Sequence, residues 1–132
     1  MAPLGAFGRI AGQSAFSRTA KRLVEGSGAI PEDERAAIGA YLRNAPVIIA
    51  LMGYSEDVLE GRFSVTGGSA VLSDGTWFWR RDAAEYVERY GTALPEDFLR
   101  NGRAARWTPA RLTRDEVLDI DDYFMWLRSQ GA

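Results

Sequence analysis

The chain has 132 residues, of which 46% are hydrophobic and 26% charged, with a formal net charge of −2 and no cysteine or histidine. This length and composition predict a single globular domain that buries its own core without disulfides or metal ions. The absence of thiol and imidazole groups excludes Cys-His and Ser-His-Asp catalysis, disulfide frameworks and the usual zinc sites. We therefore expect a protein that binds its target and does not transform it, with no cofactor and no metal.

Hydropathy along the chain gives no sign of a membrane segment. The longest apolar stretch, Ala45 to Tyr54, is about half the length that spans a bilayer. The N-terminus lacks the continuous apolar block of a secretory signal. We expect a cytoplasmic protein that does not enter the membrane.

Residues 1–28 differ in composition from the remainder and are expected to form an N-terminal basic arm. The first 24 residues carry a balance of +4 and no acid, whereas the rest carries 12 basic and 18 acidic residues, a balance of −6. A short amphipathic helix over about 14–25 is predicted by apolar residues at helical spacing, namely Phe16, Ala20, Leu23 and Val24. We favour an arm that docks on its own body or on a neighbour, although the composition also fits an organellar transit peptide.

The globular body, residues 29–132, is expected to open with a helix. Pro31 at its first position and the three acids that follow are start signals, and Pro46 ends the helix by restricting the residue before it. The run Val47–Met52 is short and rich in β-branched residues, which predicts a buried strand, although a short helix fits it too. Residues 55–61 predict a polar turn or a single helical turn.

A β-hairpin is predicted at about residues 69–80. Asp74 and Gly75 are the preferred pair for a two-residue turn in which both residues adopt positive φ, so that Ser73 would face Thr76. This register places apolar side chains on both faces, with Leu72, Trp77 and Trp79 on one and Val71 and Phe78 on the other. Such a sheet is either covered twice or keeps one face for a partner.

Two helices are predicted after the hairpin. Asp82 is a good N-cap, Glu85 would complete a capping box, and Gly91 ends the first helix. A second, short helix follows Pro95 and ends near Gly102. Together with a final helix these elements predict an α+β fold, in which a small antiparallel sheet with a β-hairpin is packed by about five helices.

The final helix is predicted to begin at a capping box formed by Thr113 and Glu116. Its core-facing stripe would consist of Val117, Ile120, Phe124 and Leu127. Asp115, Asp119 and Asp122 recur opposite this stripe and share one face. Clustered carboxylates can bind a hard cation or act in acid–base chemistry, but a solvated face that offers charge to a partner is the simpler interpretation.

A second acidic group lies in the predicted turn beside the apolar run. It consists of Glu56, Asp57 and Glu60. Loops on a rigid scaffold often carry binding residues, so this group joins the acids of the final helix as a candidate partner-binding site, although an ordinary polar surface is the simpler interpretation.

A basic stretch follows the short helix and offers an alternative function. It includes Arg100, Arg103, Arg106 and Trp107, with Arg111 and Arg114 beyond them. Together with the N-terminal arm, this stretch could follow the phosphates of a nucleic acid. The acidic balance of the body and the neighbouring acids, Asp115 and Glu116, favour local pairing instead.

The two tryptophans of the hairpin have two interpretations. Trp77 and Trp79 occupy alternate positions of one strand and could stack against sugars or bases. Aromatic side chains on a hairpin more often belong to the core, which is the interpretation we favour.

A pattern of residues from Ser73 to Leu99 resembles that of immunity proteins of polymorphic toxin systems. It comprises Ser73-Asp74-Gly75-Thr76-Trp77-Phe78-Trp79, then Glu85-Tyr86-Val87 with Tyr90, then Leu94-Pro95 with Phe98. The family consists of small acidic bacterial proteins that bind and silence a cognate toxin. The resemblance therefore implies a protein partner, and an inhibitor needs only a rigid, charged surface with a few aromatic anchors.

The sequence thus predicts a non-catalytic binding protein, most concretely an immunity-type inhibitor of a bacterial toxin. One alternative is a nucleic-acid-binding or regulatory module that uses the basic arm and residues 100–114. Another is a carboxylate-dependent enzyme, which would need two acids about 5–10 Å apart in a cleft.

Overall fold

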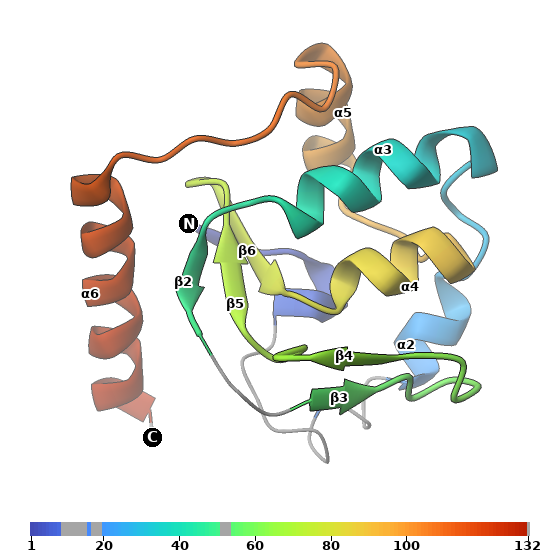
Figure 1. The fold of residues 1–132 in the computed structure, drawn as a ribbon, viewed down its shortest axis with the longest axis horizontal. Helices are drawn as coiled ribbons and strands as arrows, with labels where there is room; N and C mark the ends of the chain where they lie inside the picture. Colours follow the sequence, from blue (N-terminus) through green and yellow to red (C-terminus); the bar gives the residue numbers. More distant parts are fainter. Residues whose placement is uncertain (9–15, 17–19, 51–53, 132) are drawn as a thin grey trace.

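The computed structural model describes residues 1–8, 16, 20–50 and 54–131. Within them the chain forms a mixed four-stranded sheet, a separate two-stranded sheet and five α-helices, which confirms the α+β class (Figure 1). The four-stranded sheet has the order β1-β6-β5-β2, built from Ala2–Pro3, Trp77–Arg80, Val71–Ser73 and Val47–Ile49. The prediction of an antiparallel sheet differs from the structure at one edge, where β1 pairs with β6 in parallel.

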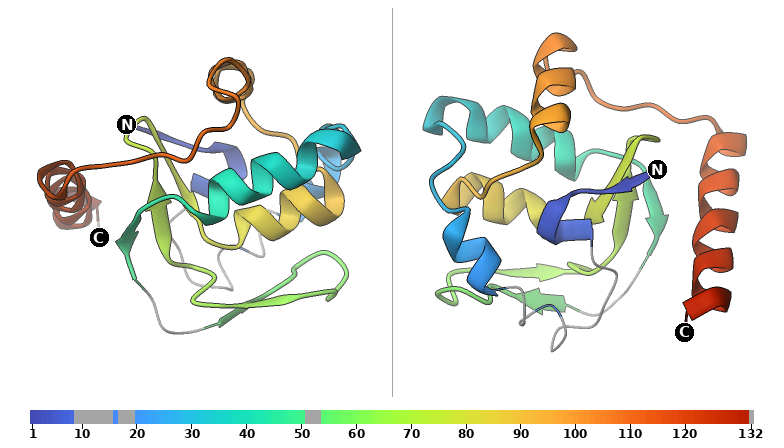
Figure 2. Two further views of the ribbon diagram at one scale, coloured as in Figure 1. Left: turned by 45° about the horizontal axis from the view of Figure 1, so that its top comes forward. Right: turned by 180° about the vertical axis from the view of Figure 1, so that it is seen from behind.

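Helices cover both faces of the four-stranded sheet. The α-helices are α2 Ala20–Glu25, α3 Glu32–Arg43, α4 Ala83–Tyr90, α5 Glu96–Ala104 and α6 Arg114–Gly131, and a 3-10 helix, η1, spans Gly5–Gly8. Helices α3 and α4 pack side by side on the inner face, whereas α6 stands alone on the outer face (Figures 1 and 2). The predicted helices after Pro31, Asp82, Pro95 and Thr113 are therefore all present.

The predicted hairpin exists, but its register is wrong by two residues. Ser73 pairs with Phe78 and not with Thr76, so the loop is Gly75-Thr76. The Asp74 carboxylate accepts hydrogen bonds from the backbone N–H groups of Thr76 and Trp77 at 2.9 and 2.8 Å. Asp74 thereby stays at the end of the strand, and Gly75 alone takes the positive φ, 94°. Because the shift is even, each side chain keeps its predicted face.

A second hairpin occupies the segment for which the sequence predicted a polar turn. Its strands are β3, Tyr54–Glu56, and β4, Ser64–Thr66, and they pair antiparallel. The strands are short and mostly polar, so they carry little of the apolar alternation that signals a strand. The run from Val47 begins as strand β2, as predicted, but the strand is not buried: Val47 is exposed and Ile48 and Ile49 are half-buried, because β2 lies at an edge of the sheet. Residues 51–53 lie outside the described part of the chain.

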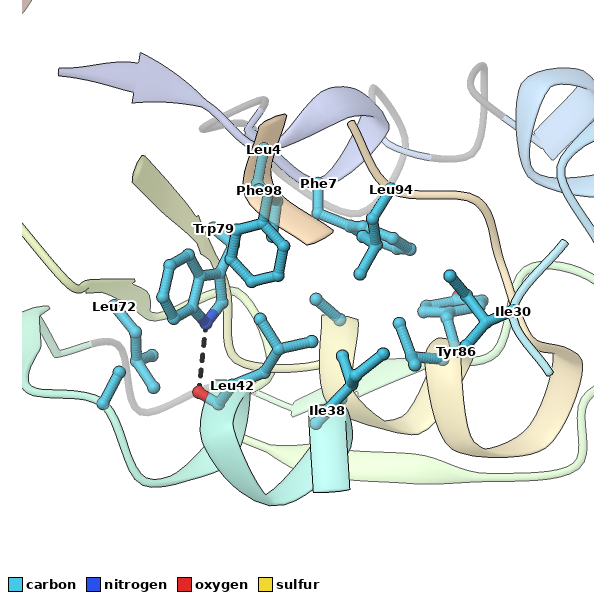
Figure 3. Close-up of a cluster of buried hydrophobic side chains, with 14 of the residues drawn as sticks. Leu4, Phe7, Ile30, Ile38, Leu42, Leu72, Trp79, Tyr86, Leu94 and Phe98 are labelled. Atoms are coloured by element: carbon cyan, nitrogen blue, oxygen red, sulfur yellow. Dashed lines mark hydrogen bonds between the residues drawn. The ribbon is translucent and has the colours of Figure 1, made fainter. Parts of the chain in front are cut away.

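The main core fills the space between the inner face of the sheet and helices α3, α4 and α5 (Figure 3). Trp79 lies at its centre, 1% exposed, and its indole N–H donates to the carbonyl of Leu42 at 3.0 Å. Phe98 contributes a T-shaped contact to Trp79 from α5, with ring centroids 6.0 Å apart. These contacts assign Trp79 to the core, as we favoured.

The N-terminal segment contributes to this same core. Its buried side chains are Leu4, Phe7, Phe16 and Leu23. Residues 2–3 add strand β1 to the sheet, where the N–H of Ala2 donates to the carbonyl of Thr76 at 2.9 Å. The described residues of the expected arm therefore dock on the body of their own chain.

The outer face carries a smaller apolar cluster beneath α6. Phe78 and Phe124 meet in a T-shaped contact with ring centroids 4.9 Å apart, beside buried Val71. Ile120 also packs against the cluster, in agreement with the predicted stripe. Helix α6 begins at the predicted capping box, in which Thr113 and Glu116 exchange hydrogen bonds of 3.1 Å. The hairpin is thus covered on both faces.

Asp82, the predicted N-cap of α4, has a different role in the structure. The helix ends at Gly91 in the left-handed conformation, as predicted, with φ of 60°. Asp82 precedes the helix but its side chain forms no capping hydrogen bond, so the predicted capping box with Glu85 is wrong. The Asp82 carboxylate instead receives hydrogen bonds from Arg80 and Ser55.

Candidate functional site

The exposed side of α6 combines acids with large apolar side chains. We call this the α6 surface, made up of Asp115, Leu118, Asp119, Asp122, Met125 and Trp126. The three predicted partner-binding acids are all exposed and lie opposite the docked stripe, as expected. Met125 and Trp126 are 60% and 56% exposed, which the sequence analysis did not anticipate. The signal was present as apolar residues outside the 3.6-residue stripe.

The second predicted acidic group is divided by the fold. Asp57 is buried, and its carboxylate accepts hydrogen bonds from the backbone N–H groups of Leu59 at 2.8 Å and Arg62 at 3.1 Å and from the hydroxyl of Tyr90. Burial opposes ionisation, but the hydrogen bonds outweigh it and lower the pKa of Asp57. Asp57 therefore holds the β3–β4 turn together and lies outside any exposed patch.

The other two acids of this group remain at the surface. Glu60 is exposed and forms an ion pair with Arg62 at 2.6 Å. Glu56 is exposed beside an open pocket of about 470 Å³, which Arg62 and Phe63 also line. The fold thus separates two exposed acids from a buried one that the sequence placed together.

The basic stretch is not a continuous cationic strip. Arg103 donates two hydrogen bonds to the carboxylate of Glu34, at 2.8 and 2.9 Å, and these lower the pKa of Glu34. Arg100 forms an ion pair with Asp97 at 2.9 Å. Trp107 is half-buried and packs on Phe98, with ring centroids 5.5 Å apart. Arg100 thus pairs locally, whereas Arg103 pairs with an acid 69 residues away. Within the described residues, Arg111 and Arg114 form no ion pair with Asp115 or Glu116, so the predicted local pairing there is wrong.

Strained backbone follows α5 at the start of this stretch. Arg106 and Trp107 adopt positive φ of 53° and 54°, a conformation that costs non-glycine residues about 1–2 kcal/mol each. The N–H of Trp107 donates to the carbonyl of Gly102 at 2.8 Å, and its ring fills the space where a Cβ of Gly102 would lie. Helix α5 thereby turns sharply into the connector, residues 105–113, that leads to α6 (Figure 2).

A pocket of about 230 Å³ lies at the tip of the β5–β6 hairpin. The hairpin contributes Asp74 and Trp77, α3 contributes Tyr41, and α5 contributes Phe98. The hydroxyl of Tyr41 donates to Asp74 at 2.7 Å, and burial, followed by this contact, raises the pKa of Tyr41 so that its hydroxyl stays protonated. Asp74 was predicted only as a turn residue. The pocket could not be predicted because Tyr41 and Asp74 are 33 residues apart in the sequence.

A buried ion pair lies at the other end of strand β6. Arg80 and Asp82 are both almost fully buried, and their side chains meet at 3.0 Å. The hydroxyl of Ser55 donates to Asp82 at 2.8 Å, and the guanidinium of Arg80 stacks 3.8 Å from the ring centroid of Phe16. Burial raises the pKa of Asp82, and the hydrogen bonds from Arg80 and Ser55 oppose that rise. The network links β3, β6 and the N-terminal segment and has a structural role.

Paired carboxylates in a cleft would be needed for the enzymatic alternative. An open pocket of about 300 Å³ is lined by Glu32 and Glu88, together with Arg35. Glu88 receives a hydrogen bond from Arg43 at 2.8 Å, and Glu32 lies 4.0 Å from Arg35. Each acid thus has a cationic partner. Among the residues that the structure describes, no group of three or more acids is arranged to hold a metal ion.

None of the helices in the described ranges combines the length and the apolarity needed to traverse a lipid bilayer. Comparisons of the chain with protein-family models, with curated proteins and with solved structures found no match. The function is therefore inferred from the surface and the pockets of the chain itself.

Proposed function

We propose that this protein is a non-catalytic binding module that docks on a protein partner through the α6 surface. The observation that carries the proposal is the exposure of Leu118, Met125 and Trp126 on a helix whose opposite side is already packed on the sheet. Exposed apolar patches rimmed by polar groups mark interaction sites in soluble domains. Tryptophan and methionine are also enriched at protein interfaces.

Charge defines the chemistry of the partner. Asp115, Asp119 and Asp122 flank the apolar residues on the same side of α6. A complementary partner surface is basic around an apolar depression, because opposite charges steer the encounter while buried aromatic anchors supply most of the affinity. The helix has 18 residues, about 27 Å of length, which is enough to lie along a groove.

A bacterial toxin is the most concrete partner within this proposal. The resemblance of residues 73–99 to immunity proteins of polymorphic toxin systems points in this direction. A toxin that acts on nucleic acids presents a basic active-site surface, and an acidic helix offers complementary charge to it. Inhibition then follows from occlusion and requires no catalytic group on this chain.

Affinity capture with matched baits tests the proposal. The test variant, Asp119→Lys with Trp126→Ser, reverses one charge and removes one exposed apolar side chain of the α6 surface. The control variant, Glu25→Lys with Val24→Ser, makes the same kinds of change on α2, where both residues are exposed. We expect a basic polypeptide to co-purify near stoichiometry with the wild type and the control and to be lost with the test variant.

Three readouts complete this design. The thermal midpoints of both variants should stay close to that of the wild type, because exposed substitutions change stability by about 0.5 kcal/mol or less. Equal capture by the test variant and the control would refute the α6 surface as the docking site. Steeply salt-dependent binding of labelled DNA or RNA, with no protein captured, would instead support a nucleic-acid-binding module.

A further inference from the structure

The pocket at the tip of the β5–β6 hairpin is distinct from the α6 surface and independent of the proposed function. It has a volume of about 230 Å³, which suits a small polar head group better than a drug-sized molecule. Its lining comes from three elements far apart in the sequence: Tyr41 of α3, Trp77 of β6 and Phe98 of α5. Ala105 and Thr108 also line it and are exposed, so they lie at its rim.

The walls of this pocket are aromatic. Trp77 and Phe98 meet edge to face, with ring centroids 6.1 Å apart and an interplanar angle of 84°. Tyr41 and Phe98 meet in the same way, at 5.9 Å and 67°. Tyr41 also contacts Trp79 and Trp107, with ring centroids 6.2 and 5.5 Å apart. Because Trp77 and Tyr41 are only partly buried and both line the pocket, part of their electron-rich aromatic surface is accessible to a ligand.

One carboxylate, that of Asp74, contributes negative charge to the pocket. Its Oδ1 accepts the N–H groups of Thr76 and Trp77, and its Oδ2 accepts the Tyr41 hydroxyl. These donors are neutral, and Asp74 forms no ion pair within the described residues. The site therefore contains a carboxylate that has no ion-pair partner among the residues that the structure describes.

The hydrogen bonds of Asp74 also restrict which cation fits. Oδ1 already accepts two donors and Oδ2 one, so the carboxylate cannot accept the two parallel hydrogen bonds of a guanidinium. A fully methylated ammonium group needs no hydrogen-bond acceptor. It is attracted by the negative charge and by the ring faces, which stabilise cations through the quadrupole of the aromatic system.

We propose that this pocket binds the trimethylammonium head of a small organic cation against its aromatic lining, with Asp74 supplying the opposite charge. The head can belong to a free molecule such as choline or to a trimethylated lysine side chain, and both present the same chemistry to the pocket. The connector also contributes to the site: Ala105 and Thr108, on either side of the strained residues Arg106 and Trp107, both line the pocket.

Calorimetric titration of the full chain tests this assignment. Choline and its neutral isostere, 3,3-dimethyl-1-butanol, have nearly the same shape and differ in charge. We expect saturable binding of choline at millimolar or lower concentration and binding of the alcohol that is at least about tenfold weaker. A short peptide with one trimethyllysine forms a second arm, and the tighter of the two cations identifies the source of the head group.

Variants place the binding in this pocket. Asp74→Asn keeps a side-chain acceptor for the hairpin and removes the charge, and it should weaken choline binding about tenfold. Asp33→Asn removes the same charge at an exposed position of α3 and should leave binding unchanged. Ala105→Lys, at an exposed position outside the hairpin, places a tethered cation at the rim and should abolish binding without disturbing the turn.

Two results would overturn the assignment. One is equal affinity for choline and the alcohol, or no saturable binding of either cation at millimolar concentration. The other is full choline binding by Ala105→Lys, whose fold is checked by its circular dichroism spectrum and thermal midpoint. Neither result bears on the α6 surface, so failure here is distinguishable from failure of the proposed function.

Discussion

The two faces of the four-stranded sheet are covered in different ways. On the inner face, Trp79 and Leu72 pack into a core to which α3, α4, α5 and the N-terminal segment all contribute. On the outer face, Val71 and Phe78 are covered by α6, which reaches them through the connector, residues 105–113 (Figure 2). Side chains on the two faces can therefore be equally buried while the elements around them differ in how cooperatively they unfold.

Helix α6 is therefore expected to open without unfolding the body. Elements with few buried apolar contacts open locally at a lower free energy than the global unfolding transition. The inner core shares side chains among many elements, so its opening requires the whole domain to unfold. The predictions that follow test this difference between the body and α6.

The largest effect is expected inside the body, at the buried ion pair. Asp82→Ala leaves the guanidinium of Arg80 buried without its carboxylate, and we expect a loss of about 3–5 kcal/mol in the free energy of unfolding. Urea denaturation at neutral pH measures this loss. Asp97→Ala, which breaks the exposed pair with Arg100, is the matched control and should cost about 0.5 kcal/mol or less. Similar losses for the two variants would contradict a structural role for the buried network.

Two phenylalanines make the comparison of the faces direct, because Phe98 and Phe124 are each 2% exposed. Phe98→Ala in the inner core should cost about 3–5 kcal/mol of global stability. Phe124→Ala should cost less, about 1–2 kcal/mol, because undocking of α6 limits the loss. Hydrogen exchange should show the α6 amides of the second variant exchanging ahead of those of α3 and α4. Equal losses, with uniform exchange, would show that α6 belongs to the same cooperative unit.

The β3–β4 turn predicts a pH dependence. The pKa of Asp57 lies below its ordinary value of 3.8 in the folded state, so its stabilisation is fully present above the unfolded pKa. That stabilisation is lost as the pH falls through the folded pKa. Asp57→Asn should therefore cost about 1–3 kcal/mol at pH 7, where charge-assisted hydrogen bonds are lost. The difference from the wild type should shrink in urea titrations below pH 3.8, and a constant difference would argue against the charge of Asp57 as its origin.

The smallest effect is expected in the connector and has the opposite sign. Arg106→Gly relieves one left-handed residue and should stabilise the chain by about 0.5–1 kcal/mol, after allowance for the greater freedom of glycine when unfolded. A rise in the thermal midpoint measures it. The exposed Arg111→Gly, which adds flexibility without relieving positive φ, is the control and should lower the midpoint slightly. Equal shifts in both variants would exclude strain at Arg106 as the cause.

Local signals in the sequence correctly predicted the features that depend only on residues close together in the chain. Gly91 ends α4 because positive φ suits glycine, and the Thr113–Glu116 box forms because its four hydrogen-bonding groups lie within one helical turn. The faces of the hairpin followed from the two-residue alternation of strands. Such features require no knowledge of the rest of the fold.

Three of the failures share one cause, which is a hydrogen bond from a distant residue to an aspartate. Asp74 is held by Tyr41, Asp82 by Ser55 and Asp57 by Tyr90, at separations of 33, 27 and 33 residues. Each was interpreted from its neighbours, as a turn, a cap or a surface residue. Tertiary contacts outweighed those local preferences, and so the hairpin-tip pocket and the buried ion pair could not be predicted.

The connector also determines how strongly the sheet competes with any other protein for the buried side of α6. A connector of this length extends to about 30 Å, so a detached α6 never leaves the neighbourhood of its own sheet. Its return is an intramolecular step, equivalent to a docking surface present at roughly millimolar concentration. A protein that binds the exposed side of α6 does not compete with this intramolecular docking. A protein that binds the buried side chain of Phe124 must displace the sheet of the same chain.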